Sequence, residues 1–270
     1  MHLKDLTGYD LGTHTARYTA RDAILYALAV GASASELDLV YERDLRVLPT
    51  YACALGLWAV EAAGSLGAYD RKRSLHASQA LTMHKPMPRE GAIAMRGKIA
   101  AVWDKGKATI VEVAVESDVF TASYTIFLPG LGNWGGAGGP AAAAEEATGG
   151  TPWNASYATT PNLAALYRLT GDLHPIHIDP EVARANGFDR PILHGLCTLG
   201  IAARMSAQGA GAHPCDLKSL KARLSAPVMP GETIALSAQV SEKASDKALS
   251  FEAQVDGRAV LKGGHVVFGG

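Results

Sequence analysis

Three side chains that can exchange protons lie close together in the segment YRLTGDLHPIHIDPEVARANGF, residues 167–188. They are Asp172, His174 and His177. Ile176 and Ile178 are uncommon in a fully solvated loop, whereas Pro175 is uncommon in the interior of a strand. A turn that keeps ionisable groups partly dry is therefore expected. A carboxylate and an imidazole held in such a turn can grip one water molecule and move its protons.

Two short elements are expected to position these side chains. Asp179 followed by Pro180 has the pattern of a helix N-cap with proline in the first turn, and Asn186–Gly187 has the pattern of a C-cap. The sequence predicts a short helix over 179–186, preceded by a turn-like segment over 171–178. That segment lies between the first strand and the long helix of the second half, so it is expected to overhang the mouth of a groove.

The chain repeats one order of elements in its two halves. Each half has a long apolar helix followed by segments of alternating apolar and polar residues, which predict half-buried strands. The helices are expected over 51–65 and 196–208. The strands are expected over 78–85, 92–103, 107–116 and 120–128, and again over 217–226, 233–242, 248–255 and 258–268. Hairpin turns are expected at 104–106 and 256–257.

Short matches between the halves indicate an internal duplication. LPTYACALG, from Leu48, resembles ILHGLCTLG, from Ile192, and aligns Cys53 with Cys197 at an offset of 144 residues. Pro88 and Pro230 align at an offset of 142 residues. Between the halves, Gly, Pro and Ala dominate, which is typical of a flexible linker. We therefore expect an N-terminal unit over 1–130, a Gly/Ala-rich linker over 131–151 and a C-terminal unit over 152–270.

One long helix against a strongly curved antiparallel sheet is the plan of a hot-dog fold. The helix must be apolar on nearly all sides because the sheet wraps around it, and LCTLGIAARMSA meets this requirement apart from Arg204. The predicted fold class is therefore α+β, a double hot-dog with two central helices. A single continuous sheet would bury edges that either half alone would leave open.

The chemical segment resembles the signature of the MaoC-like, or type 2, enoyl-CoA hydratases. That signature is a tyrosine, a short spacer and Gly-Asp-x-Asn-Pro-aliphatic-His. The matching residues are Tyr167, Gly171, Asp172, Pro175, Ile176 and His177. The resemblance continues through GFDRPILHGLCTLG and reaches RDAILYALAVGAS, LVYERDLRVLPT and HASQALTMHKPMP in the first half. His174 departs from the pattern because the family has Asn there. It can replace that Asn, shift substrate preference or weaken activity.

The resemblance implies reversible hydration of trans-2-enoyl-CoA to (3R)-3-hydroxyacyl-CoA, and suggests a homodimer. Asp172 and His177 would be the catalytic pair, and the backbone N–H of Gly195 would belong to the oxyanion hole. Gly195 opens the second long helix, where the N–H groups favour negative charge and glycine allows close approach. The first half lacks the Gly-Asp-x-x-Pro-x-His pattern and has Tyr51 where the second has Gly195. We expect it to shelter the acyl chain.

Two rival functions remain open at this stage. A hot-dog thioesterase would need a carboxylate on a central helix, and the second long helix has none, although the first carries Glu61. A non-catalytic acyl-CoA-binding subunit would follow if His174 disables the site. His174, His177 and His194 could suggest a metal, but there is no Cys pair and no His-Glu-x-x-His helix, so we expect no metal. We also expect no cofactor beyond the CoA of the substrate.

The CoA phosphates need cationic partners. Lys221 and Arg223 lie on a predicted strand near the groove and are candidates for this role. The alternative is that they are ordinary outward-facing strand residues, and the sequence does not decide between the two. His76 and Gln79 lie in a stretch that the family also shows, and we assign neither a catalytic role.

Bulk properties exclude several other classes of function. The formal net charge is −1 over 270 residues, so nothing favours a nucleic-acid partner. No apolar run approaches the ~20 residues of a membrane span, and the N-terminal segment has no signal-peptide pattern. Three widely spaced cysteines do not suggest a disulfide framework, and Cys53 and Cys197 are expected to fill the core. We therefore expect a reducing, cytoplasmic location.

Overall fold

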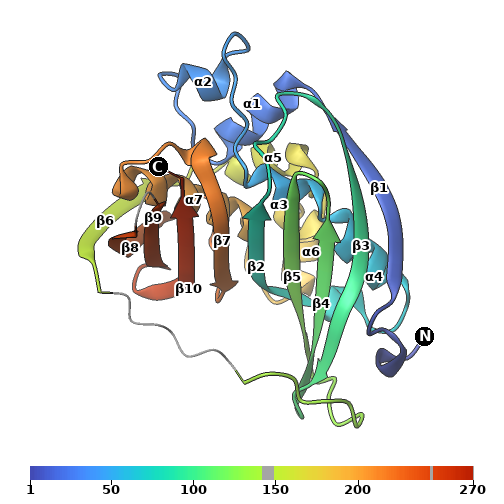
Figure 1. Cartoon of the computed structure of the whole chain (residues 1–270). Coiled ribbons are helices and arrows are strands. Elements are labelled where there is room, and N and C mark those ends of the chain that lie inside the picture. Colours follow the sequence, from blue (N-terminus) through green and yellow to red (C-terminus); the bar gives the residue numbers. More distant parts are fainter. Residues whose placement is uncertain (142–148, 244–245, 270) are drawn as a thin grey trace.

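The protein is described by a computed structural model that covers residues 1–141, 149–243 and 246–269. It contains one antiparallel sheet with ten strands (Figure 1). In chain order the strands are β1 (Asp10–Tyr18), β2 (Leu75–Met83), β3 (Gly91–Asp104), β4 (Ala108–Glu116), β5 (Phe120–Pro129), β6 (Thr151–Ala158), β7 (Leu217–Leu224), β8 (Thr233–Lys243), β9 (Asp246–Val255) and β10 (Arg258–Phe268). All eight strands that were predicted with bounds are present, whereas no bounds were predicted for β1 and β6.

The order of the strands mirrors the two halves of the chain. It runs β1-β3-β4-β5-β2-β7-β10-β9-β8-β6, so each first-half strand has a counterpart at the same distance from the middle. β2 and β7 meet at the centre through antiparallel pairing from Ser78–Arg223 to Thr82–Ser219. The predicted continuous sheet and double hot-dog architecture are therefore confirmed.

The central helix of the second half, α7, runs from Gly195 to Ala210. It contacts all five strands of its half, β6 to β10, as expected for a helix wrapped by a curved sheet. Arg204 is the charged residue of α7, and its guanidinium forms an ion pair with Glu36 at 2.5 Å. Near-uniform burial explains why the apolar pattern predicted this helix well.

The single first-half helix predicted over 51–65 is wrong, because the structure divides it into α3 (Tyr51–Leu55) and α4 (Trp58–Ser65). The hydroxyl of Tyr124, on β5, donates a 2.7 Å hydrogen bond to the carbonyl of Cys53. In a continuous helix that carbonyl would accept from Leu57, whose N–H instead bonds to the carbonyl of Ala54. A side chain inserted into the helical hydrogen-bond ladder is a recognised cause of such interruptions.

The shorter helices connect these layers. They are η1 (Leu3–Asp5), α1 (Ala20–Ala29), α2 (Leu37–Val40), η2 (Arg71–Arg73), α5 (Leu163–Tyr167), η3 (Arg168–Thr170), η4 (Pro175–His177), α6 (Pro180–Ala185) and η5 (Pro214–Asp216). The predicted helix over 179–186 corresponds to α6, whose N-cap is Asp179. In the described part of the chain, no helix has the length and apolar character needed to cross a membrane. Cys53 and Cys197 are buried free thiols.

The part of the predicted linker that precedes residue 142 is hydrogen-bonded to the β3–β4 hairpin. The carboxylate of Asp104 accepts hydrogen bonds from the backbone N–H groups of Gly106, Asn133 and Gly135, at 2.9–3.0 Å. Residues 142–148 of the predicted linker lie outside the described residues. Thr151, the last residue of the predicted linker, is the first residue of β6.

Candidate active site

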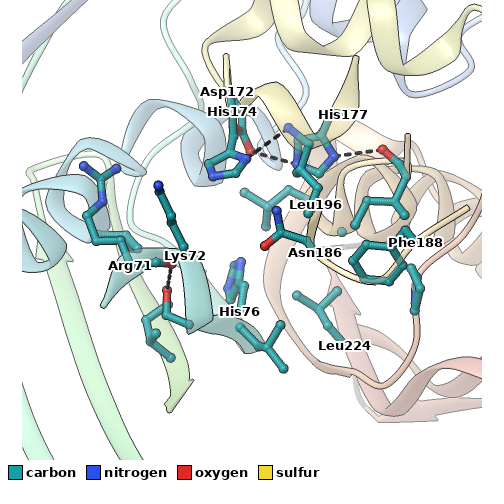
Figure 2. A pocket seen from close by; sticks show the side chains of 18 of the residues that line it. Arg71, Lys72, His76, Asp172, His174, His177, Asn186, Phe188, Leu196 and Leu224 are labelled. Atoms are coloured by element: carbon teal, nitrogen blue, oxygen red, sulfur yellow. Dashed lines mark hydrogen bonds and ion pairs between the residues drawn. The ribbon is translucent and has the colours of Figure 1, made fainter. Parts of the chain in front are cut away.

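A cavity of about 630 Å³ is lined by residues from both halves of the chain. Its walls come from α4, η2 and β2 in the first half, and from η4, the start of α7 and the end of β7 in the second. Figure 2 shows Asp172, His174 and His177 on one side of this space, with His76 and Leu224 opposite. The turn-like segment predicted over 171–178 therefore borders the cavity, and the structure brings Asp172, His174, His177 and Gly195 together in its lining.

A short run of turns orients the acid. η3 ends at Thr170 and is capped by Gly171, whose φ of 136° is readily available only to glycine. Asp172 follows immediately, and one of its carboxylate oxygens, Oδ1, accepts the backbone N–H of His174 at 3.1 Å. This hydrogen bond leaves the second oxygen, Oδ2, directed toward His177.

Asp172 and His177 form a pair that does not bond directly. Nε2 of His177 lies 3.9 Å from Oδ2 of Asp172, and the side chains are only 11% and 20% exposed. Nδ1–H of His177 donates to the carbonyl of Ile192 at 2.8 Å, so in the neutral ring Nε2 carries the free lone pair. Because 3.9 Å is too long for a hydrogen bond, a water molecule at roughly 2.8 Å from each atom fits between them.

The site keeps His177 neutral. Burial holds the pKa of His177 below its usual value, and the negative charge of Asp172 opposes this shift only in part. A neutral imidazole beside a carboxylate offers two proton acceptors to one water molecule. This is the arrangement needed to activate that water as a nucleophile.

His174 stands where the family pattern has Asn, and its ring caps the next turn. Nδ1 of His174 accepts the backbone N–H of Ile176 at 3.2 Å, at the start of η4. The same two-residue capping bond is one that Asn makes readily. In the neutral ring the hydrogen then lies on Nε2, which leaves one donor on an exposed side chain at the cavity.

Gly195 opens α7 at the cavity, as predicted. His194 is the N-cap residue, and its side chain makes no capping hydrogen bond, so the first N–H groups of the helix remain available to a ligand. A methyl group at Gly195 would lie 3.1 Å from Cδ2 of Leu224, which is tight. The absent side chain therefore lets a substrate approach this end of the helix.

Asp172, His177 and His194 offer ligand atoms within 4.8 Å of one another. The rings of His177 and His194 are stacked, with centroids 3.7 Å apart and an interplanar angle of 24°. A metal ion lies in the plane of each imidazole that binds it, and stacked rings direct their lone pairs along nearly parallel lines. These residues therefore do not suit a common metal ion.

The structure places Lys221 and Arg223 away from the cavity. Both are exposed on β7, whose inward residues at this point are Leu220 and Ala222. Neither lines the cavity, and this agrees with the alternative that they are outward-facing strand residues. Sequence reasoning missed the cationic group that does line it, the consecutive residues 71–73 of η2.

Arg71, Lys72 and Arg73 are exposed at the edge of the cavity. Arg71 forms an ion pair with Glu61 of α4. No ion pair of Lys72 or Arg73 is found within residues 1–141, 149–243 and 246–269. Three consecutive cations were visible in the sequence, but only the packing of η2 beside α4 brings them to the cavity.

His76 also borders the cavity, from β2, and its Nε2 lies 3.0 Å from the carbonyl of Ser78. Burial lowers the pKa of His76 to about 4. Gln79 is buried, and its amide nitrogen donates to the carbonyl of Ala80 at 3.0 Å. No contact joins either side chain to the Asp172–His177 pair in the described structure, so they keep no catalytic assignment.

Comparison with known proteins agrees with this geometry. The family described as "MaoC like domain" matches residues 144–259, and "MFE-2 hydratase 2 N-terminal domain" matches residues 17–129. The 3-hydroxyacyl-thioester dehydratase Y of Mycobacterium tuberculosis is 37% identical over 80% of this chain and 80% of its own length. The chain belongs to the MaoC-like hydratase 2 family. The predicted resemblance is confirmed.

A longer relative and two solved structures are also similar to this chain. The peroxisomal multifunctional enzyme type 2 of Mus musculus is 35% identical over 84% of this chain, which spans about a third (33%) of that relative. The MaoC-like dehydratase from Phytophthora capsici has a TM-score of 0.86 and 29% identity, covering 97% of this chain and 96% of its own. A Mycobacterium tuberculosis protein described as having a double hotdog fold shares the fold, with a TM-score of 0.66 and 15% identity.

Proposed function

We propose that this chain is a hydro-lyase that reversibly hydrates trans-2-enoyl-CoA to (3R)-3-hydroxyacyl-CoA. The observation that carries the proposal is the 3.9 Å separation of Asp172 Oδ2 and His177 Nε2 beside the start of α7. The names of relatives support it, because they include "Probable enoyl-CoA hydratase 2" of Dictyostelium discoideum and "Enoyl-CoA hydratase 2, peroxisomal" of Arabidopsis thaliana.

In the proposed reaction one water molecule binds between Asp172 and His177. As its oxygen bonds to C3 of the enoyl group, it gives up a proton to this pair, and the electrons of the double bond move toward the thioester oxygen. A proton then passes from the pair to C2, so that the net change is the addition of one water. The two groups act as a coupled unit, so we assign the base role to the pair.

Negative charge on the thioester oxygen is stabilised in this proposal by the N–H of Gly195. That N–H lies at the positive end of α7, a 16-residue helix. A backbone donor of this kind is typically worth about 10²–10³ in rate. Nε2–H of His174 is a further donor for the substrate at the edge of the cavity.

The first half supplies binding surface in this proposal. Leu57 and Val60 of α4 give the cavity apolar walls, which suit the acyl chain. Lys72 and Arg73 are placed to attract the phosphates of CoA, in the role that the sequence had offered to Lys221 and Arg223. A homodimer and a cytoplasmic location remain predictions, and several relatives carry the word peroxisomal in their names.

A thioesterase is the second candidate, because Glu61 brings a carboxylate from a central helix to the cavity. Its side chain is 53% exposed and its carboxylate is already paired with Arg71, whereas Asp172 and His177 leave room for a water molecule between them. A non-catalytic acyl-CoA-binding subunit is the third candidate, and it depends on His174 disabling the site.

One assay separates these three functions. Purified protein is offered trans-2-enoyl-CoA, and the conjugated double bond and free thiol are followed together. Loss of the double bond without release of thiol, with a product of (3R) configuration, is the expected result. Release of thiol would replace the proposal by a thioesterase, and tight binding without either change would replace it by a non-catalytic subunit.

A further inference from the structure

His194 contacts each part of the Asp172–His177 site. It directly precedes Gly195 and is the N-cap residue of α7. Its Nε2–H donates to the backbone carbonyl of Asp172 at 3.1 Å, and its ring stacks on that of His177 with centroids 3.7 Å apart. It is 1% exposed, so both contacts are made away from solvent, where they are strongest.

The ring of His194 also contacts Tyr167, which continues into a chain of aromatic rings. Tyr167 of α5 lies 4.8 Å away between centroids, and Tyr26 of α1 lies 6.0 Å from Tyr167. Tyr26 in turn stacks on Tyr51, at 4.7 Å. A chain of rings therefore runs from the first half of the protein to His177, and it fixes the orientation of His194.

We propose that His194 is a positioning residue that holds Asp172 by its hydrogen bond and His177 by its stacked ring, while remaining neutral itself. This inference rests on the proposed hydration reaction. Nδ1 of His194 is buried and has no hydrogen-bond partner within the described ranges, so the ring carries its one proton on Nε2. A second proton on Nδ1 would place a buried cation against His177.

The charges around the stack agree with a neutral His194. Burial, followed by the charge that His177 acquires on protonation, lowers the pKa of His194 to about 3. Asp172 opposes this shift from the turn, and Arg168 of η3 adds to it. His177 faces Asp172 and also His174, whose charge when protonated lowers the pKa of His177 further. His76 approaches from β2 and is kept neutral by burial.

Two substitutions each remove one of the two contacts of His194 and keep the other. His194→Phe keeps an aromatic ring on His177 but removes the donor to the Asp172 carbonyl. His194→Gln keeps a donor at about the position of Nε2 but removes the ring, so water reaches His177. His84→Gln is the matched control, because His84 is exposed and bonds to Thr121 outside the cavity.

Two measurements are made on each variant. The first is the acid limb of the profile of kcat/KM against pH, and the second is the NMR titration of the His177 ring. In His194→Gln both should move upward toward about 6.5, the ordinary imidazole pKa, because His177 becomes hydrated. In His194→Phe the limb should stay in place while kcat falls about 10²-fold, because Asp172 is no longer held. His84→Gln should behave as wild type.

The inference is overturned if folded His194→Gln titrates like wild type, or if His194→Phe retains wild-type kcat. A purely structural residue would lower the melting temperature in both variants without moving the limb. The NMR titration needs no substrate. If the wild-type protein does not hydrate enoyl-CoA, the proposed function fails, while the titration still tests the contact between the two rings.

Discussion

The two central helices begin at equivalent places in the two halves, at Tyr51 for α3 and at Gly195 for α7. Tyr51 is 3% exposed and lies between the rings of Tyr18 and Tyr26, so the start of α3 is filled by aromatic side chains. The start of α7 borders the cavity instead. The same position in one fold therefore serves as core in one half and as a candidate anion site in the other.

The segments that precede the two helices also differ in the ionisable side chains that they bring to the helix start. In the second half, the turn from Gly171 to Ile178 brings Asp172 and His177 to the start of α7. The first half has no such motif, and its helix is interrupted where Tyr124 bonds to the carbonyl of Cys53. Within the described residues, an open helix N-terminus and an overhanging acid–imidazole pair therefore occur together at the start of α7 and not at the start of α3, which is why the proposed reaction is assigned to the second half.

The largest expected effect tests this asymmetry with one aspartate from each half. Asp172→Asn should reduce turnover by at least about 10³-fold, because it removes an acceptor for the attacking water. Asp22→Asn in the first half weakens the capping box with Thr19 and should cost about 1 kcal/mol of stability with turnover unchanged. Steady-state kinetics and urea unfolding check both. Near-normal turnover in Asp172→Asn would remove it from the site.

The second test compares the two helix starts. Gly195→Ala should lower kcat about 10²-fold with little loss of stability, because the new methyl group crowds Leu224 and the thioester oxygen. Tyr51→Ala should instead cost about 3–5 kcal/mol of stability, because it empties a buried aromatic position. Kinetics and denaturant unfolding of both variants separate these effects. Equal losses of stability would contradict the distinction between the two sites.

The third test is the pH dependence of the second-half site. Neutral His177 is needed to accept a proton, and burial lowers its pKa, so protonation requires a lower pH than for an exposed histidine. Activity should therefore persist below pH 6.5 and then fall about tenfold per pH unit. The profile of kcat/KM against pH measures this. A limb above the ordinary imidazole value would show that burial does not control His177.

The fourth test compares two cationic pairs, one from each half. The double variant Lys72→Gln/Arg73→Gln should raise KM for enoyl-CoA roughly three- to tenfold with kcat unchanged, since exposed charge pairs are weak. The double variant Lys221→Gln/Arg223→Gln should change KM less than about twofold. With thioesters of dephospho-CoA, the KM values of the wild type and of the Lys72→Gln/Arg73→Gln variant should lie closer together. A larger rise in KM for the Lys221→Gln/Arg223→Gln variant would instead indicate that β7 binds the phosphates.

The smallest effect on activity is expected at the interruption between α3 and α4. Tyr124→Phe removes the buried hydrogen bond to the carbonyl of Cys53 and should cost about 1–2 kcal/mol of stability. Turnover should be retained, because neither residue lines the cavity. Tyr41→Phe is a suitable control at an exposed tyrosine. Unchanged stability would mean that Tyr124 does not hold the two short helices apart.

Much of the sheet and one helix could be predicted because their patterns are local. β10 was predicted over 258–268, the bounds that it has, although register shifts beside Leu261 and between Lys262 and His265 interrupt its alternation. α7 was recognised because a helix wrapped by a sheet is apolar on nearly all sides. The division of α3 from α4 could not be predicted, because it depends on Tyr124, about seventy residues away.

The candidate site was predictable where its residues are adjacent in sequence. The family signature around Asp172 and His177 suggested a pair that shares one water molecule, which the spacing of the two residues alone would not have established. The proposed positioning role of His194 could not be predicted, because its stacking on His177 and its contact with Tyr167 arise from packing. The outward direction of Lys221 and Arg223 follows the alternation with Leu220 and Ala222, and the sequence had left it open as the alternative to a phosphate role.

The mirrored strand order has a consequence for how such proteins diversify. In the proposed reaction the reacting side chains come from a short contiguous stretch of the second half, whereas α4 and η2 of the first half would contact the acyl chain and the CoA phosphates. Substitutions in the walls of the first half can therefore change substrate contacts without replacing a reacting group, provided that the contacts between the halves are kept, among them β2 with β7, Tyr26 with Tyr167 and Glu36 with Arg204. Exchanging first halves between homologues should transfer acyl preference while the stereochemical course of the reaction is inherited from the second.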